Sequence, residues 1–125
     1  MSIKDLEPKI VWNYFNDITQ IPRPSKKEEK IIAYLLDFAK KHNLEAKKDK
    51  AGNVLIIKPA TPGKEDVQTV ILQSHMDMVC EKNSDVTHDF DNDPIETIID
   101  GDWVKANGTT LGADNGIGVA MQLAV

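Results

Sequence analysis

This sequence of 125 residues has little cysteine. It also lacks long apolar runs and a surplus of positive charge. Cys80 is the only cysteine, which excludes an internal disulfide bond. No run of about 18 apolar residues occurs, so we expect no transmembrane helix and no membrane partner. The charged start, Met1 to Asp5, lacks the apolar stretch of a secretory signal. Together these absences favour a cytoplasmic protein.

The negative charge is concentrated in one stretch of the chain. Between Asp77 and Asp102 there are nine acidic residues and one base, Lys82, which gives a net charge of −8, whereas the rest of the chain has 14 bases and 11 acids, a net charge of +3. An acidic stretch attracts cations and repels phosphate groups, so we do not expect nucleic acid as a partner. For most of these carboxylates, a solvated loop is the simpler interpretation.

A histidine and an aspartate follow the apolar run Val70-Ile71-Leu72. This run predicts a buried strand over residues 68–74, and the motif Ser74-His75-Met76-Asp77 lies where the strand ends. In α/β sheets, ligands bind beyond the carboxyl ends of the strands. A histidine can bind a metal through one ring nitrogen while a carboxylate holds the other. On this motif alone, a structural histidine at a strand end is the simpler interpretation.

A glycine-rich loop 39 residues after His75 carries one acid, Asp114. Glycine adopts positive φ angles and lets the backbone approach a ligand closely, and the apolar residues 117–125 predict a helix with Asp114 at its start. Asp114 could be a helix N-cap or a second metal ligand. Because a first potential ligand already lies at a strand end, the metal hypothesis gains weight. The segment Gly112 to Gly118 lacks the Gly-x-Gly-x-x-Gly order of dinucleotide sites and the lysine of a P-loop.

The remaining sequence predicts a scaffold of helices and short strands. Ser25 and Glu28 match a capping box that opens a helix ending near His42. The other predicted elements are a helix over 8–19, an antiparallel pair of strands at 44–49 and 53–58, and a hairpin over 95–106 that turns at Asp100-Gly101. The prolines of residues 21–24 are expected to interrupt regular secondary structure after the first helix. We therefore expect an α/β fold, with helices and a mixed sheet forming an α/β/α sandwich.

The chain resembles the N-terminal part of the aminoacyl-histidine dipeptidases, the Xaa-His (carnosinase-like) branch of the aminoacylase and carboxypeptidase-G-like zinc metallopeptidases. The resemblance runs from about residue 8 to the last residue. The matching stretches are Ile21-Pro22-Arg23-Pro24-Ser25 with Glu28-Glu29, Gly52 to Ile56, Leu72 to Val79, His88-Asp89-Phe90 with Asp93-Pro94-Ile95, and Gly108 to Gly118.

This resemblance implies a dinuclear zinc centre. Asp114 would bridge two zinc ions, and His75 would bind one of them. Asp77 would accept a hydrogen bond from the other ring nitrogen of His75. Cobalt and manganese are alternative metals. The resemblance also implies a cis peptide bond between Asp114 and Asn115. The expected substrate is a dipeptide that ends in histidine, and the full-length enzyme is expected to form a homodimer.

In such enzymes the general base and the remaining metal ligands come later in the sequence than Val125. We therefore expect residues 1–125 to be the N-terminal part of a metallopeptidase catalytic domain, truncated at Val125 and inactive alone. Three alternatives stay open. The chain could be an inert structural fragment, a regulatory or binding module without catalysis, or a nucleotide-binding domain that uses Gly112 to Gly118.

Overall fold

The computed structural model describes residues 1–125, and the chain divides into two compact units. The first unit comprises Met1–Ile31 and Ser74–Val125, and the second comprises Ile32–Gln73. Helix α2 (Glu29–Lys41) begins in the first unit and continues through the second. The residues of the predicted metal site all lie in the first unit.

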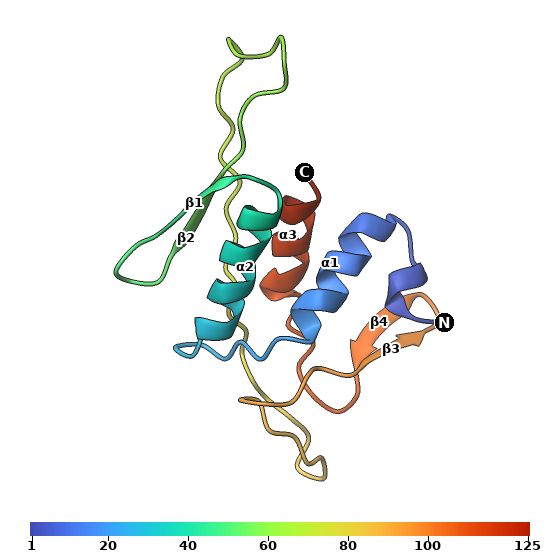
Figure 1. Ribbon diagram of the computed structural model, residues 1–125. Helices are drawn as coiled ribbons and strands as arrows, with labels where there is room; N and C mark the ends of the chain where they lie inside the picture. The colour runs from blue at the N-terminus through green and yellow to red at the C-terminus, as the bar shows by residue number, and fades with distance from the viewer. The chain divides into compact units, whose positions relative to one another are not determined.

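Two helices and a hairpin form most of the first unit (Figure 1). Its elements are the 3-10 helix η1 (Ile3–Asp5), α1 (Lys9–Thr19), β3 (Thr97–Asp100), β4 (Trp103–Ala106) and α3 (Ala113–Ala124). The strands β3 and β4 pair antiparallel, with Asp100 opposite Trp103. The predicted helix over 8–19 and the predicted hairpin over 95–106 are thereby confirmed.

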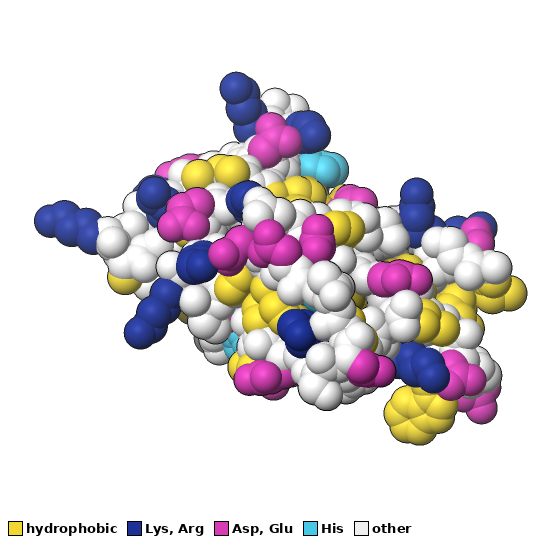
Figure 2. Space-filling view, turned by 90° about the horizontal axis from the view of Figure 1, so that it is seen from below, with side chains coloured by type: hydrophobic (Ala, Val, Ile, Leu, Met, Phe, Trp, Pro, Cys, Tyr) yellow, Lys and Arg dark blue, Asp and Glu magenta, His cyan; other side chains and the backbone are white.

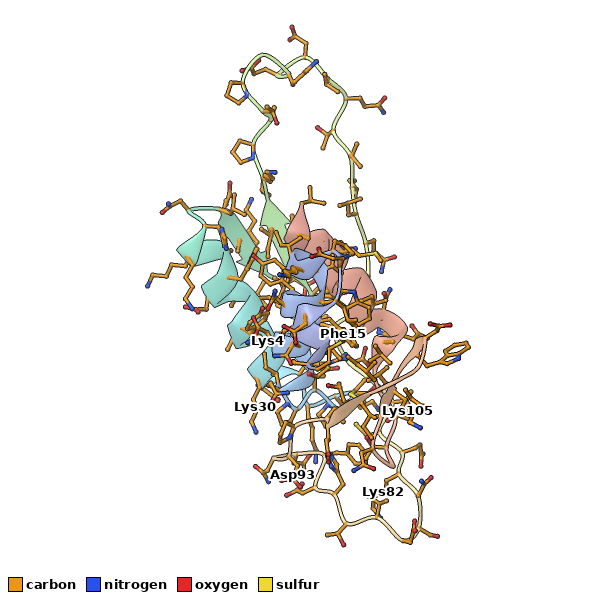
Figure 3. The ribbon with its side chains drawn as sticks, turned by 90° about the vertical axis from the view of Figure 1, so that its right-hand side faces the viewer. Lys4, Phe15, Lys30, Lys82, Asp93 and Lys105 are labelled. Carbon is orange, nitrogen blue, oxygen red and sulfur yellow. The ribbon has the colours of Figure 1, made fainter.

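The core of the first unit lies between α1 and α3. Phe15 and Ile18 of α1 and Val119 and Ala120 of α3 are all buried. Phe15 points from α1 toward α3 (Figure 3), and a Cβ atom added at Gly116 would lie 3.2 Å from its ring. Full burial of such a side chain contributes about 1.5–3 kcal/mol. The helix packing therefore holds the start of α3, where Asp114 lies, in a fixed place.

The second unit contains most of α2 and the antiparallel strands β1 (Glu45–Lys48) and β2 (Val54–Ile57). Asp49 orders the turn between them, since its carboxylate accepts hydrogen bonds from the backbone and side-chain N–H groups of Asn53 at 2.9 and 2.8 Å. After β2, residues 58–73 form a long loop that extends beyond the hairpin (Figure 1). The two strands predicted at 44–49 and 53–58 are confirmed.

The buried strand predicted over 68–74 is wrong. Val70, Ile71 and Leu72 are 76%, 85% and 54% exposed, and no strand pairs with this segment. A strand needs a neighbour that takes up its backbone hydrogen bonds, and the chain places none there. The α/β class is confirmed, but the sheets are two separate antiparallel pairs instead of one mixed sheet in a sandwich.

The acidic stretch lies mostly at the surface, as its simpler interpretation expects. Asp91 pairs with Lys27 at 2.9 Å, and Asp100 pairs with Lys105 at 2.6 Å, with all four side chains at least half exposed. Figure 2 shows acidic side chains next to basic side chains on one face of the molecule, and the basic ones are lysines because the only arginine, Arg23, is buried. Exposed pairs of this kind contribute about 0–1 kcal/mol each.

No helix has the length and apolar character needed to cross a bilayer.

Candidate metal centre

His75 lies between two carboxylates. Its Nδ1 atom is 3.0 Å from Asp77 Oδ1, and its Nε2 atom is 3.0 Å from Asp114 Oδ1. The expected approach of His75 and Asp114 is confirmed although 39 residues separate them, and so is the expected position of Asp77 beside the ring. The His75 side chain is 49% exposed and that of Asp114 is 96% exposed, so the pair is open to solvent.

The two carboxylates set the charge state of this cluster. The hydrogen bond that His75 donates to Asp114 is the main cause that raises the pKa of His75, burial opposes this shift, and Asp77 raises the pKa further. The pKa of Asp77 is lowered, mainly by the hydroxyl of Ser25 and also by His75. A protonated His75 donates to both carboxylates. A neutral His75 whose Nδ1–H faces Asp77 turns the lone pair of Nε2 toward Asp114, an arrangement that suits a shared cation.

The separation of the two potential ligand atoms fits a single zinc ion. Zinc lies about 2.0–2.1 Å from nitrogen and oxygen ligands, so two ligands of one tetrahedral ion are roughly 3.3 Å apart. Nε2 of His75 and Oδ1 of Asp114 are 3.0 Å apart, so these two atoms need to move apart only slightly to bind the same ion. The structure gathers no group of three or more potential ligands. A catalytic zinc has three protein ligands, so these residues supply part of a centre.

Asp114 is presented by an irregular start of α3. Gly112 is the N-cap residue, with a φ angle of 76°, and Asp114 and Asn115 have backbone angles that are not helical. The peptide bond between Asp114 and Asn115 is cis, as the resemblance implied. The interpretation of Asp114 as an N-cap is wrong, because Gly112 takes that position. The carboxylate of Asp114 is thereby left available to His75.

Arg23 joins the segment of His75 and the loop of Asp114. The sequence did not predict this role. Its side chain is 1% exposed, and its guanidinium donates to the carbonyl oxygens of Met76 at 3.1 Å, Asp77 at 3.2 Å and Gly112 at 2.7 Å. Burial lowers the pKa of Arg23 to about 10, while the charge of Asp77 opposes that shift. The only signal was an arginine between two prolines within a matching stretch. Its contacts hold the segment of His75 and the loop of Asp114 together.

The glycines of the loop make room for this arginine. A Cβ atom at Gly112 would lie 2.5 Å from Nη2 of Arg23, and one at Gly116 would lie 2.7 Å from the same atom. A Cβ atom at Gly118 would meet the side chain of Asn115. The backbone thus approaches the chain's own side chains closely. This arrangement does not favour the nucleotide-binding alternative, which needs a loop open to phosphate.

Ser25 contacts the centre, and it does not form the predicted capping box, because α2 begins only at Glu29. Its hydroxyl donates to Asp77 Oδ2 at 2.5 Å, and the carboxylate of Glu28 accepts from the backbone N–H of Lys26 at 2.8 Å. A capping box needs Glu28 to accept from the N–H of Ser25 itself. The local pattern could not show that the helix begins at Glu29 and not directly after Ser25.

The chain is similar to known peptidases in sequence and in fold. No protein-family profile matches the chain. It is 51% identical over 123 residues to the cytosol non-specific dipeptidase of Escherichia coli K12, a match that covers 98% of this chain and 25% of that protein. The crystal structure of aminoacylhistidine dipeptidase from Vibrio alginolyticus superposes with a TM-score of 0.97 at 51% identity, covering 99% of this chain and 25% of that one.

A more distant structure shares the fold. A tripeptidase from Staphylococcus aureus superposes with a TM-score of 0.74 at 24% identity, and the match covers 93% of this chain and 30% of that one. The chain spans about a quarter of the length of the dipeptidases it matches at 51% identity. Over nearly all of its length it is similar, in sequence and in fold, to one quarter of an aminoacylhistidine dipeptidase, which confirms the resemblance seen in the sequence.

Proposed function

We propose that the full-length protein containing this chain is a metal-dependent dipeptidase with a preference for Xaa-His dipeptides. The observation that carries the proposal is the position of His75, whose two ring nitrogens each lie 3.0 Å from a carboxylate. The names of the two dipeptidases support the reaction class. One name specifies aminoacylhistidine substrates and the other is non-specific, so the preference for histidine is the part that most needs a test.

Each residue of the centre has a distinct role in this proposal. Nε2 of His75 and the carboxylate of Asp114 would hold zinc, with Asp114 shared with a second ion; cobalt or manganese could use the same ligands. Asp77 accepts the Nδ1 proton of His75, which fixes the ring orientation and its tautomer and raises its basicity. A bound zinc pair supplies Lewis acidity and an activated water for attack on a peptide carbonyl. The general base and the other ligands belong to sequence outside this chain.

The proposal extends to location and partners. The cytosolic name of the E. coli relative supports a cytoplasmic location, and the expected partner is a dipeptide. A homodimer is proposed for the full-length protein. Light scattering coupled to gel filtration measures its mass directly, and a monomer at micromolar concentration would remove this part of the proposal.

The central experiment measures hydrolysis of Gly-His, β-alanyl-His and Gly-Leu by the full-length protein. A chelator is expected to abolish turnover and added zinc to restore it. His75→Ala should remove nearly all activity, whereas the control His42→Ala, at an exposed residue after α2, should keep it. Full activity in the chelated protein or in His75→Ala would disprove metal-dependent catalysis at this centre. Equal kcat/KM for Gly-His and Gly-Leu would disprove the preference for histidine.

An inert fragment or a module without catalysis gives a different outcome. Either alternative leaves the full-length protein without turnover on any dipeptide even when zinc is present. Zinc titration followed by isothermal calorimetry then separates them, because a metal-binding module still releases heat that His75→Ala abolishes.

A further inference from the structure

We propose that Ser25 is a positioning residue of the metal centre, which orients the Asp77 carboxylate and through it the imidazole of His75. The inference rests on the proposed function. It concerns one hydroxyl group that donates to Asp77 and not to the proposed metal ligands His75 and Asp114.

The two oxygens of Asp77 have separate partners. Oδ1 lies 3.0 Å from Nδ1 of His75, and Oδ2 accepts the hydroxyl hydrogen of Ser25 at 2.5 Å. The other acceptor near that hydroxyl, the carbonyl of Met78, is 3.5 Å away. A serine hydroxyl has a single hydrogen, and hydrogen bonds to ionised acceptors are shorter and stronger than neutral ones. Ser25 therefore donates to Asp77, and both ends of the carboxylate are fixed.

The backbone around Ser25 is itself anchored to the Asp77 segment. The N–H of Met78 donates to the carbonyl of Arg23 at 3.0 Å, and Pro24 and Met78 form an isolated parallel bridge. The buried guanidinium of Arg23 holds the carbonyls of Met76 and Asp77. Because the proline ring also restricts the backbone before Ser25, the hydroxyl reaches Asp77 from a defined position.

This contact matters because the χ2 torsion of an aspartate is broad. Without Ser25, the carboxylate of Asp77 can rotate and share Oδ1 between His75 and water. The tautomer that presents Nε2 to a metal is then less strongly favoured. The exposed surface of Ser25 makes it a poor candidate for a purely structural role, since loss of its hydroxyl leaves no cavity.

The test compares Ser25→Ala, Ser25→Thr and the control Ser84→Ala, an exposed serine elsewhere in the first unit, in the full-length protein. Zinc affinity is measured by competition with a chromogenic chelator, and the visible spectrum of the cobalt-loaded protein reports ligand geometry. Ser25→Ala is expected to weaken zinc affinity or kcat by about 10-fold, the lower end of the range for residues behind metal ligands. KM for the dipeptide and the thermal midpoint should not change, and Ser25→Thr should restore the loss.

The decisive measurement is the double variant with Asp77→Ala. If Ser25 acts through Asp77, Ser25→Ala has no further effect on zinc affinity once Asp77 is removed. Additive losses would overturn the proposal, and so would a Ser25→Ala protein with the zinc affinity and cobalt spectrum of the wild type. If Ser25→Ala fails to fold, Ser25→Thr and Ser25→Cys give the comparison, and loss of metal binding that tracks the thermal midpoint overturns it. Wild-type zinc affinity in His75→Ala would instead refute the proposed function.

Discussion

Asp77 illustrates how one side chain can connect two others through its separate oxygen atoms. It accepts from His75 through one oxygen and from Ser25 through the other. We expect Asp77→Ala to lower zinc affinity or kcat/KM of the full-length protein by about 10–100-fold, because His75 loses the partner that fixes its tautomer. The measurement is chelator competition together with steady-state kinetics. Asp102→Ala, in the exposed turn between β3 and β4, is the control, and wild-type behaviour of Asp77→Ala would remove the role assigned to it.

Gly112 has little tolerance for a side chain, because both its backbone angle and its neighbour Arg23 oppose one. Its φ angle is 76°, and a Cβ atom would lie 2.5 Å from Nη2 of Arg23. Gly101→Ala is the matched control, because its φ angle is 59° and nothing lies within 4 Å of the added Cβ. A left-handed alanine costs about 1–2 kcal/mol.

We expect Gly112→Ala to lower the free energy of unfolding by more than Gly101→Ala does, since the first substitution also displaces Arg23. Urea unfolding measures both values. Gly112→Ala should in addition weaken zinc binding, whereas Gly101→Ala should not. Equal losses of stability in the two variants would show that displacement of Arg23 does not contribute to the loss of unfolding free energy in Gly112→Ala.

The residues of the centre differ in how far the sequence could reveal them. His75, Asp77 and Asp114 were predicted because their side-chain chemistry and glycine-rich surroundings form recognisable local motifs. Arg23 and Ser25 were not, because their contacts join residues 52 to 89 positions apart. No periodicity or spacing encodes such distances, and only the folded chain brings these groups together.

At the scale of elements, periodicity predicted what depends on local sequence. The apolar spacing of α1 and α2 and the turn residues Asp100-Gly101 gave helices and a hairpin that the structure confirms. The segment 68–74 failed because its burial depends on a partner strand, which lies outside the pattern of any one segment. The predicted capping box also failed, because α2 begins at Glu29 and the carboxylate of Glu28 accepts from the N–H of Lys26.

The β3–β4 hairpin should respond to pH through one ion pair. The hydrogen bond and charge of Lys105 lower the pKa of Asp100, so the ionised carboxylate is favoured in the folded state. The contribution of the pair is therefore present above the unfolded pKa of about 3.9 and is lost as the pH falls through the lowered folded value. NMR titration of Asp100 is expected to show a pKa that rises toward the ordinary value in Lys105→Ala. An unchanged pKa in that variant would exclude the ion pair as its cause.

At the scale of the whole molecule, the chain is short compared with the dipeptidases it resembles. It covers 25% of each dipeptidase it matches at 51% identity, and it gathers no group of three potential ligands. We expect residues 1–125, assayed alone with zinc, to show no measurable hydrolysis of Gly-His. Absence of a general base by itself costs about 10²–10⁴-fold.

The assay requires rigorously purified chain and a His75→Ala sample prepared in parallel. Turnover that disappears in His75→Ala would show that these residues build a complete active site, and the interpretation as part of a centre would then be wrong. Turnover that persists equally in both samples would identify a contaminating peptidase.

The three carbonyl contacts of Arg23 have a consequence for how the chain is made in a cell. Gly112 follows Arg23 by 89 residues, and ribosomes add about 5–20 residues per second, so roughly 4–18 s separate their synthesis. Through this interval the hydrogen bond from Arg23 to Gly112 cannot form, and His75 and Asp114 cannot yet lie side by side. The contacts that join the two segments of the centre are therefore completed only after Gly112 and Asp114 have been made.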